Sequence, residues 1–377
     1  MFKAEELFRN VSDKNHADET VLTIIQGKGT LPREQAGRNI HYDDASLSNY
    51  KKVEAGDFII HLRSFEGGLE MANEAGIVSP AYTILRCKRP HSSLFYDAYF
   101  HTDEFINHNL SKSVEGIRDG RQISYEAFKW LGIPYCERTE QEKISNLFAV
   151  LNQRIEKQRD LVKALKKYKR GLLFREFGSA NHIPSDAKYM GKLSDFFSLS
   201  SGSTPSSTNK AFYSGTIRWV SSGELKPKYI YETNQHISSE AVSVCNLREY
   251  PANTLLIAMY GLEAAGVRGT ASILRVPSTI SQACMAIQQT GEIDIEYIYY
   301  WYIYNGQWIG TRIAQGTKQQ NLSTDTLGNL KINAPSLIKQ KEVCKLLSHF
   351  DNRIEKENQK YDLFNSIKRG LLQKLFI

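Results

Sequence analysis

The chain repeats one long segment after an interval of 199 residues. Residues 140–177 read EQEKISNLFAVLNQRIEKQRDLVKALKKYKRGLLFREF, and residues 339–376 read KQKEVCKLLSHFDNRIEKENQKYDLFNSIKRGLLQKLF. Without any gap, the strings RIEK and KRGLL recur at the same places in both copies. Because self-similarity at a fixed interval means that one structural unit occurs twice, the repeat constrains the architecture more than any local pattern does.

Seam residues in both copies follow a heptad pattern, with spacings that alternate between four and three. This spacing predicts a helix that packs along a partner helix. Neither copy contains proline, so each predicts an unbroken helix of about 38 residues, or roughly 57 Å at ~1.5 Å per residue. The predicted seam consists of Ile144, Phe148, Leu151, Ile155, Gln158, Val162, Leu165, Lys169 and Leu172, and of Val343, Leu347, Phe350, Ile354, Glu357, Tyr361, Phe364, Lys368 and Leu371.

Polar residues interrupt both seams at the same two places, Gln158/Glu357 and Lys169/Lys368. A polar seam position lowers stability but fixes the register, so we expect the two helices to pair with each other. Two unrelated surface helices would not share these interruptions. Parallel pairing would place both globular domains at one end of the rod. We predict antiparallel pairing, which relates the halves by a pseudo-two-fold axis and sets Gln158 opposite Glu357.

The similarity continues upstream of the helices, so the repeated unit is a globular domain followed by a helix. Residues 123–133 align with 322–332, AGDFII at 55–60 resembles ANTLLI at 252–257, and SPAY at 79–82 resembles SQAC at 281–284. Each domain has an ordinary size for a single fold. The predicted segments are a first domain at 1–139, a helix at 140–178, a second domain at 179–338 and a helix at 339–377.

Short β-prone runs bounded by turn residues alternate with helical stretches, which predicts α+β domains with a twisted sheet of unassigned topology. A polar loop is expected at 202–210. Strands are expected at 58–62, 82–86, 217–220, 254–260 and 271–276, and helices at 124–131 and 293–309.

Composition predicts a cytoplasmic protein. The hydrophobic fraction of 41% is typical of a folded globular chain, and no apolar run approaches the ~18 residues of a membrane span. The N-terminus lacks the apolar core of a signal peptide, and five scattered cysteines indicate free thiols.

The charge of the chain is concentrated in the two predicted helices. Ten Lys and Arg against five acidic residues at 140–178, and nine against five at 339–377, give these segments +9, whereas the whole chain carries +7. A basic rod favours nucleic acid, but a charge run is also typical of a solvated helix face. Charge alone leaves both interpretations open.

Common catalytic signatures are missing from the sequence. There is no GxGxxG string after a predicted strand, no phosphate-binding GxxxxGK[ST] and no methyltransferase motif with paired prolines. Residues 224–226 form only a lone ExK, Ser221 is not in a GxSxG elbow, and the histidines lack metal-ligand spacing. We therefore predict no catalytic residues and no metal site, and favour a binding protein over a fused methyltransferase–nuclease.

Several strings resemble the specificity (S) subunits of type I restriction–modification systems over essentially the full length. In the helices they are Pro134 with Glu140-Gln141 and Ile144, Pro335 with Gln340, RIEK and KRGLL. In the domains they are GIVSPAY at 76–82, RDGRQIS at 118–124, GSTPS at 202–206, IRWVSSGEL at 217–225 and GTKQQNLS at 316–323. The interval from proline to glutamine is two residues longer in the first copy. The first domain lacks GSTP and WVSS, so the two domains are expected to read different sequences.

The resemblance implies two target-recognition domains that each read half of a split double-stranded DNA target, and a helix pair that sets the unread gap. It implies that the chain has no activity or cofactor of its own. Two methyltransferase subunits would bind AdoMet, and restriction/translocase subunits would use ATP and Mg. Outward positions near 169–171 and 368–370 would dock the methyltransferase. A related methyltransferase–nuclease system, or an orphan or phase-variable copy, is the alternative.

Arg, Lys, Gln, Ser and Tyr side chains on loops could reach DNA bases. For each, an exposed polar loop residue is the competing interpretation, and Gln319 and Gln320 could instead cap the next helix. The candidates are Arg63, Arg118 and Arg121 in the first domain and Ser221, Lys226, Tyr260, Arg268, Lys318 and Gln319 in the second.

Overall fold

The computed structural model describes residues 1–36, 44–116, 122–178, 187–264, 266–314, 316 and 321–376. The chain divides into two compact units, and each unit contains one globular domain and part of both long helices. Unit 1 consists of residues 1–160 and 357–377, and unit 2 consists of residues 161–356. Helices and sheets are mixed in both units, which confirms the predicted α+β class.

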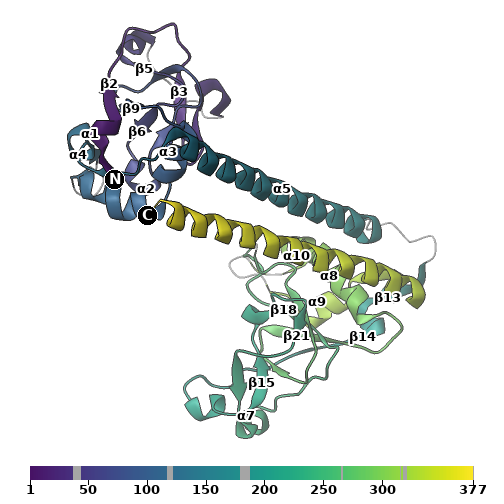
Figure 1. Ribbon diagram of the computed structural model, residues 1–377. Helices are drawn as coiled ribbons and strands as arrows, with labels where there is room; N and C mark the ends of the chain where they lie inside the picture. The colour runs from purple at the N-terminus through teal and green to yellow at the C-terminus, as the bar shows by residue number, and fades with distance from the viewer. Residues whose placement is uncertain are drawn as a thin grey trace. The chain divides into compact units, whose positions relative to one another are not determined.

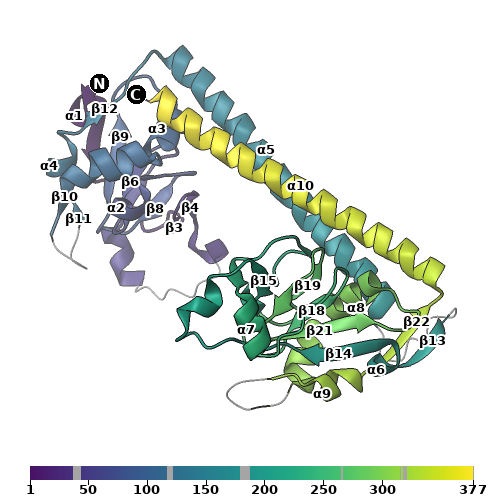
Figure 2. The same cartoon turned by 90° about the horizontal axis from the view of Figure 1, so that it is seen from below.

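The two predicted long helices are α5 (Arg138–Phe177) and α10 (Leu337–Leu375), and each begins two residues before the predicted segment. They run side by side in both views (Figures 1 and 2). In unit 1, Phe148 stacks on Phe376 with ring centroids 6.2 Å apart, and Gln158 contacts Glu357 at 2.7 Å. Residue numbers rise along α5 while they fall along α10, so the pairing is antiparallel as predicted.

The same direction holds in unit 2, where the C-terminal part of α5 meets the N-terminal part of α10. Tyr168 packs on Phe350 with ring centroids 5.1 Å apart, and Leu173 shares a core cluster with Leu347 and Cys344. Every side chain of the predicted seam is buried or half-buried. The heptad pattern therefore marks the face along which α5 and α10 pack.

The domain of unit 1 is built on a four-stranded antiparallel sheet of order β2-β9-β6-β7. Its strands are β2 (Phe8–Val11), β9 (Thr83–Cys87), β6 (Phe58–Ile60) and β7 (Glu70–Met71). Strand pairs surround it: β1 (Phe2–Lys3) with β12 (Gly132–Ile133), β3 (Leu22–Ile25) with β4 (Gly29–Pro32), β5 (Lys51–Val53) with β8 (Gly76–Val78), and β10 (Val114–Glu115) with β11 (Gln122–Ile123). The α-helices are α1 (Ala4–Leu7), α2 (Ser64–Gly67), α3 (Ser93–Phe100) and α4 (Tyr125–Phe128). Three 3-10 helices, η1 (Arg33–Ala36), η2 (Asp44–Asn49) and η4 (Leu110–Ser113), and one π-helix, η3 (Glu104–Asn109), accompany them.

Aromatic rings form the core of this domain. Phe58 of β6 packs edge-on against Phe100 of α3 with ring centroids 4.9 Å apart, and Phe8 of β2 packs against Tyr96 at 5.0 Å. Such edge-to-face contacts stabilise a core beyond the area that they bury. Phe376 joins the same cluster, so the end of α10 is part of the unit 1 core.

The domain of unit 2 contains a five-stranded sheet of order β14-β21-β18-β19-β16 and a three-stranded sheet of order β17-β15-β20. The strands are β14 (Phe197–Ser201), β21 (Cys284–Gln289), β18 (Leu255–Ala258), β19 (Ala271–Leu274), β16 (Tyr229–Ile230), β17 (Gln235–Ile237), β15 (Ile217–Val220) and β20 (Thr279–Ile280), with a separate pair of β13 (Ala187–Lys192) and β22 (Lys331–Pro335). The helices are α6 (Leu193–Phe196), α7 (Ser239–Val244), α8 (Ile295–Trp308) and α9 (Thr324–Gly328), with turns η6 (Lys210–Tyr213), η7 (Ser222–Glu224) and η8 (Ile309–Ile313). The central strands β18 and β19 are buried along their whole length, as expected where both faces of a sheet are covered.

The sheets carry the same duplication as the sequence. Order β2-β9-β6-β7 in the first domain matches β14-β21-β18-β19 in the second. The similar strings AGDFII and ANTLLI contain β6 and the start of β18, and SPAY and SQAC precede or open β9 and β21. The topology that the sequence left unassigned is therefore one sheet plan used twice.

The strands expected at 58–62, 254–260 and 271–276 are shorter than predicted, as β6, β18 and β19. Both helices predicted within the domains are also shorter than their local pattern indicates. The helix expected at 124–131 is limited to α4, because Ala4 donates a hydrogen bond to Leu131 O at 2.8 Å and Gly132 then enters the β12–β1 pair. The helix expected at 293–309 starts after Asp294, whose side chain accepts from the Glu296 N–H at 2.8 Å. In both cases, hydrogen bonds outside the helix decide the boundary. Among the described helices, none has the length and hydropathy of a membrane span.

Candidate nucleic-acid interface

Several loops meet at one end of the second-domain sheets. The loops follow β14, β15 and β18 and precede β21 and α9. Backbone hydrogen bonds connect them: Ser203 N to Ile280 O (3.1 Å), Ser281 N to Val220 O (2.9 Å), Met259 N to Ala283 O (2.9 Å) and Leu322 N to Met259 O (2.8 Å). This edge therefore presents several loops from one fixed scaffold, an arrangement typical of binding sites.

Ser221 and Lys226 belong to a tight turn at this edge. The Ser221 hydroxyl donates to Glu224 Oε2 at 2.8 Å, and the Ser221 N–H donates to the same atom at 2.9 Å. Glu224 Oε1 accepts from the Asn234 N–H at 2.7 Å. The glutamate of the ExK string thus shapes the turn, while Lys226 is exposed.

Tyr260 and Arg268 lie in one loop between β18 and β19. Arg268 is half-buried, and its guanidinium donates to Leu262 O at 2.6 Å and Glu263 O at 2.8 Å. These bonds hold the loop together and use part of the donor set that base recognition would need. Tyr260 is 37% exposed at the end of β18 and is free to meet a ligand.

Arg63 occupies the corresponding place in the first domain. It is exposed and follows β6 as Tyr260 follows β18, at the 197-residue interval that relates AGDFII to ANTLLI. The structure therefore brings one candidate of each domain to equivalent sheet ends. Four predicted contacts, Arg118, Arg121, Lys318 and Gln319, lie outside the described residues.

Two fully buried glutamines, missing from the predicted site, connect the long helices to the domains. Gln141 Oε1 accepts from the Ser92 N–H at 2.9 Å, at the N-terminus of α3. Gln340 Oε1 accepts from the Asp294 N–H at 2.8 Å, at the N-terminus of α8. Their amide groups donate to Cys136 O and Pro335 O, at 2.8 and 2.9 Å. Their recurrence at an interval of 199 was the signal that could have identified them.

Lys228, also missed, connects the second domain to the helix pair of unit 2. Its ammonium group contacts Glu296 Oε2 at 3.3 Å, the Tyr300 hydroxyl at 3.0 Å and Ser348 Oγ at 3.2 Å. The Tyr300 hydroxyl donates to Asp351 Oδ2 at 2.7 Å. Asp351 also forms an ion pair with the seam residue Lys169. No sequence pattern distinguishes Lys228 from other loop lysines.

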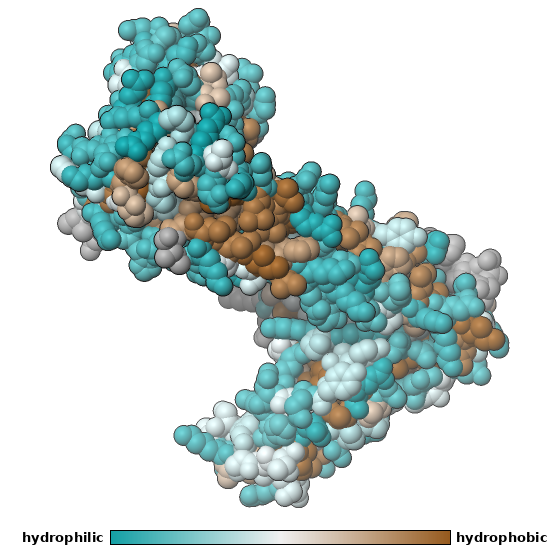
Figure 3. All heavy atoms as spheres, in the orientation of Figure 1, coloured by the Kyte–Doolittle hydropathy of each residue, from teal (hydrophilic) through white to brown (hydrophobic). Residues whose placement is uncertain are grey.

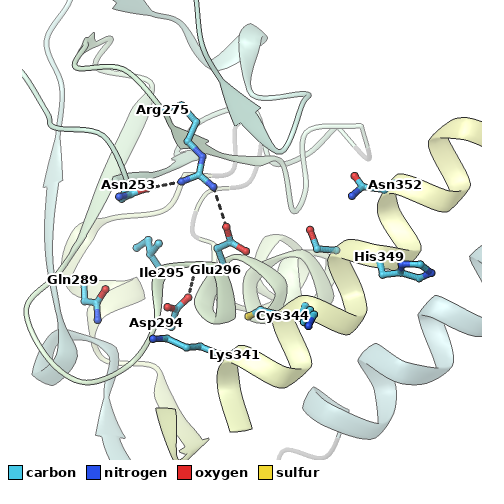
Figure 4. Close-up of a pocket in the computed structure, with 12 residues that line it drawn as sticks. Asn253, Arg275, Gln289, Asp294, Ile295, Glu296, Lys341, Cys344, His349 and Asn352 are labelled. Carbon is cyan, nitrogen blue, oxygen red and sulfur yellow. Dashed lines mark hydrogen bonds and ion pairs between the residues drawn. The ribbon is translucent and has the colours of Figure 1, made fainter. Parts of the chain in front are cut away.

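A polar cavity of about 660 Å³ opens beside this network, between α10 and the second domain (Figure 4). Arg275 reaches into it and contacts Asn253 at 2.6 Å and Glu296 at 3.0 Å. Burial raises the pKa of Glu296, but hydrogen bonds from Tyr229 and Lys228 and the charge of Arg275 outweigh it and hold that pKa below its usual value. None of the described candidate DNA contacts lines this cavity.

The outward faces of α5 and α10 carry apolar residues that the pairing does not cover. Figure 3 shows apolar surface along the helices among hydrophilic residues. A groove of about 440 Å³ is centred on Tyr168 and Gly171, next to the basic string that the sequence marked for docking. The exposed large apolar residues are Leu147, Val150, Leu161, Tyr168 and Phe174 on α5, and Ile338, Leu346, Leu363, Ile367 and Leu375 on α10.

Within the described part of the chain, no three His, Cys, Asp or Glu side chains are grouped to hold a metal ion.

A family model for the type I restriction modification DNA specificity domain matches residues 184–363. This match covers 180 of the 377 residues, just under half of the chain. The chain is 28% identical over 201 residues to the MjaIX specificity subunit of Methanocaldococcus jannaschii, which is 52% of this chain and 45% of that protein. It is 24% identical over 282 residues to the EcoR124I/EcoR124II specificity subunit of Escherichia coli, 72% of this chain and 65% of that protein. The matched segments thus span less than two thirds of either relative.

Solved structures show the same fold. The HsdS subunit from Thermoanaerobacter tengcongensis aligns over 100% of this chain and 95% of its own length, with a TM-score of 0.53 at 14% identity. The S subunit of a type I system from M. genitalium has the same coverage and a TM-score of 0.59 at 14% identity. A chain from a study of complex assembly in a type I system gives a TM-score of 0.63 at 12% identity, covering 99% of this chain and 96% of that one.

Proposed function

We propose that this chain is the DNA-recognition subunit of a type I restriction–modification complex, in which each domain reads one half of a split target. The observation that carries the proposal is the specificity-domain match together with a sheet plan used twice. Equivalent loops at equivalent sheet ends are consistent with two domains that bind DNA in the same way. Because the residues of these loops differ, each domain is proposed to recognise a different half-site. Arg63 and Tyr260 are the first candidates for base contact.

The helix pair is proposed to set the gap between the half-sites and to hold the modification subunits. The exposed apolar residues on both helices, Tyr168 and Ile367 among them, favour docking of partner helices. In this proposal the chain has no catalytic activity. AdoMet belongs to two methyltransferase subunits, and ATP and Mg belong to restriction/translocase subunits.

A domain exchange tests the proposal. Residues 1–133 are replaced by the corresponding domain of another specificity subunit, and the hybrid is expressed with the modification subunits in a cell that lacks other methyltransferases. Methylome sequencing should show one altered half-site, the other half-site retained and the gap unchanged. A change in both half-sites would contradict two independent reading heads. Arg63→Ala and Tyr260→Ala, with the exposed helix residue Arg159→Ala as control, test the proposed contacts in the same assay.

A further inference from the structure

The ends of the two long helices are interchangeable in residue type. In unit 1, Phe376, the residue directly after α10, packs on Phe95 and Tyr99, with ring centroids 5.1 and 5.5 Å apart. Phe177 of α5 stands at the same repeat position, and KRGLL precedes both phenylalanines at the same distance. The end of α5 from a second copy of this chain would therefore offer the first domain the same apolar residues as α10 does. The residues at the helix ends therefore do not distinguish α10 of the same chain from α5 of a second copy.

The middle of the seam is not interchangeable. Gln158 Nε2 donates to Glu357 Oε2 at 2.7 Å and to Glu357 O at 2.9 Å, and these residues are only 5% and 1% exposed. They occupy the same repeat position, one neutral and one acidic. If like helices of two copies paired, Gln158 would face Gln158 and Glu357 would face Glu357.

Two Glu357 side chains facing each other would be buried like charges, and each would lose the amide donor that Gln158 supplies. Two buried carboxylates that face each other repel strongly unless one of them takes up a proton. Lys360 contacts Glu357 Oε1 at 3.1 Å, but the Lys360 side chain is 55% exposed and lies on the solvent side of the seam. The Lys169–Asp351 ion pair could be replaced by Lys368 with Asp351 in a pair of α10 helices, whereas in a pair of α5 helices Lys169 would meet Asn152, the repeat counterpart of Asp351.

Side-chain size around the centre acts in the same direction. Seven residues from the centre, Leu151 and Leu165 of α5 correspond to Phe350 and Phe364 of α10. The observed antiparallel pairing sets leucine opposite phenylalanine on both sides. Pairing of like helices would set Phe350 against Phe364 in one pair and leucine against leucine in the other, which overfills one seam and underfills the other.

We propose that the Gln158–Glu357 contact, supported by this difference in size, selects pairing of the two unlike helices of one chain and rejects like-helix pairing with a second copy. The apolar residues shared by both seams stabilise the pairing, and the Gln158–Glu357 position determines which helices pair. This selection is independent of DNA recognition.

Full-length variants can create the rejected contacts inside one chain. Q158E places two carboxylates at the centre, E357Q places two amides there, and Q158E/E357Q reverses the native pair. The folding equilibrium constant at pH 7.5 should fall at least about tenfold in Q158E, and the double variant should return to within about threefold of the wild type. E357Q should lie between them.

Measurement at pH 5 keeps the test informative if Q158E does not fold at pH 7.5, because protonation of one carboxyl removes the repulsion. The Q158E deficit should then shrink. The proposal is overturned if Q158E matches the wild type at pH 7.5, or if the double variant is no more stable than Q158E. DNA recognition is not measured in this experiment, so its outcome leaves the proposed function standing.

Discussion

His101 of unit 1 lies between two carboxylates. Its Nε2 is 3.3 Å from Glu70 Oε1, and its Nδ1 is 3.6 Å from Asp97 Oδ1. Burial lowers the pKa of His101, but the hydrogen bond to Glu70 and the charge of Asp97 raise it by more, so the net pKa is above the ordinary value. The carboxylate of Glu70, fully buried, also accepts from the N–H groups of Gly27 and Gly29. His101 therefore supports the carboxylate that holds the turn between β3 and β4.

A pH dependence of stability follows at this residue. A raised pKa in the folded state adds stability that is complete below the ordinary histidine pKa of about 6.5 and is lost as the pH rises through the folded value. The free energy of unfolding of the wild type should therefore fall as the pH rises above neutrality. His101→Gln should weaken that dependence in denaturant titrations, whereas the exposed His108→Gln should leave it intact. Equal slopes for wild type and His101→Gln would contradict this role.

At the scale of elements, one buried glutamine joins the start of each long helix to the start of a domain helix. Gln340 bridges the Asp294 N–H and Pro335 O, and Gln141 does the same for Ser92 and Cys136. A helix N-terminus has backbone donors without intrahelical partners, so these side chains fix where α3 and α8 begin. Each glutamine thereby joins the start of a long helix to a domain helix of the same unit by a buried hydrogen bond.

Gln340→Ala should lower the free energy of unfolding by about 1–3 kcal/mol, since a buried donor and a buried acceptor lose their partner. Gln141→Ala should have a similar effect in the other unit. Gln359→Ala, on the exposed face of α10, is the matched control and should change stability by less than about 0.5 kcal/mol. Thermal and denaturant unfolding of the purified chain measure all three variants. An equal effect at Gln359 would remove the special role of the buried glutamines.

For the whole molecule, the proposed gap depends on the length of a continuous helix pair. Inserting seven residues directly after Gln158 and directly before Glu357 keeps the heptad phase in both antiparallel helices and leaves the Gln158–Glu357 contact in place. At ~1.5 Å per residue the insertion adds about 10 Å, which corresponds to about three base pairs of B-DNA. Methylome sequencing should find both half-sites retained and the gap longer by about this amount.

A five-residue insertion at the same places is the control, because it shifts the seam out of phase and should destabilise the pair instead of lengthening the gap. An unchanged gap after the seven-residue insertion would contradict the proposal that the helix pair sets the gap. It would leave the proposed recognition by the two domains intact.

The helices were predictable because their pattern is local. The spacing of Ile144, Phe148 and Leu151, continued through both copies, requires only that one face of a helix be covered. The polar interruption at Gln158 and Glu357 also indicated a shared register. The partners of the candidate DNA contacts were harder to predict, because Ser221 and Arg268 form hydrogen bonds inside their own loops. Local composition does not distinguish such a residue from one whose side chain is available to bind a ligand.

The sequence by itself determined the duplication, the two long helices and the face along which each is buried, since these follow from repeat and period. The tertiary structure decided the sheet order shared by both domains, the buried bonds of Gln141, Gln340 and Lys228, and the ends of α4 and α8. Those features rest on hydrogen bonds and packing between residues far apart in the chain, and no local pattern encodes such partners.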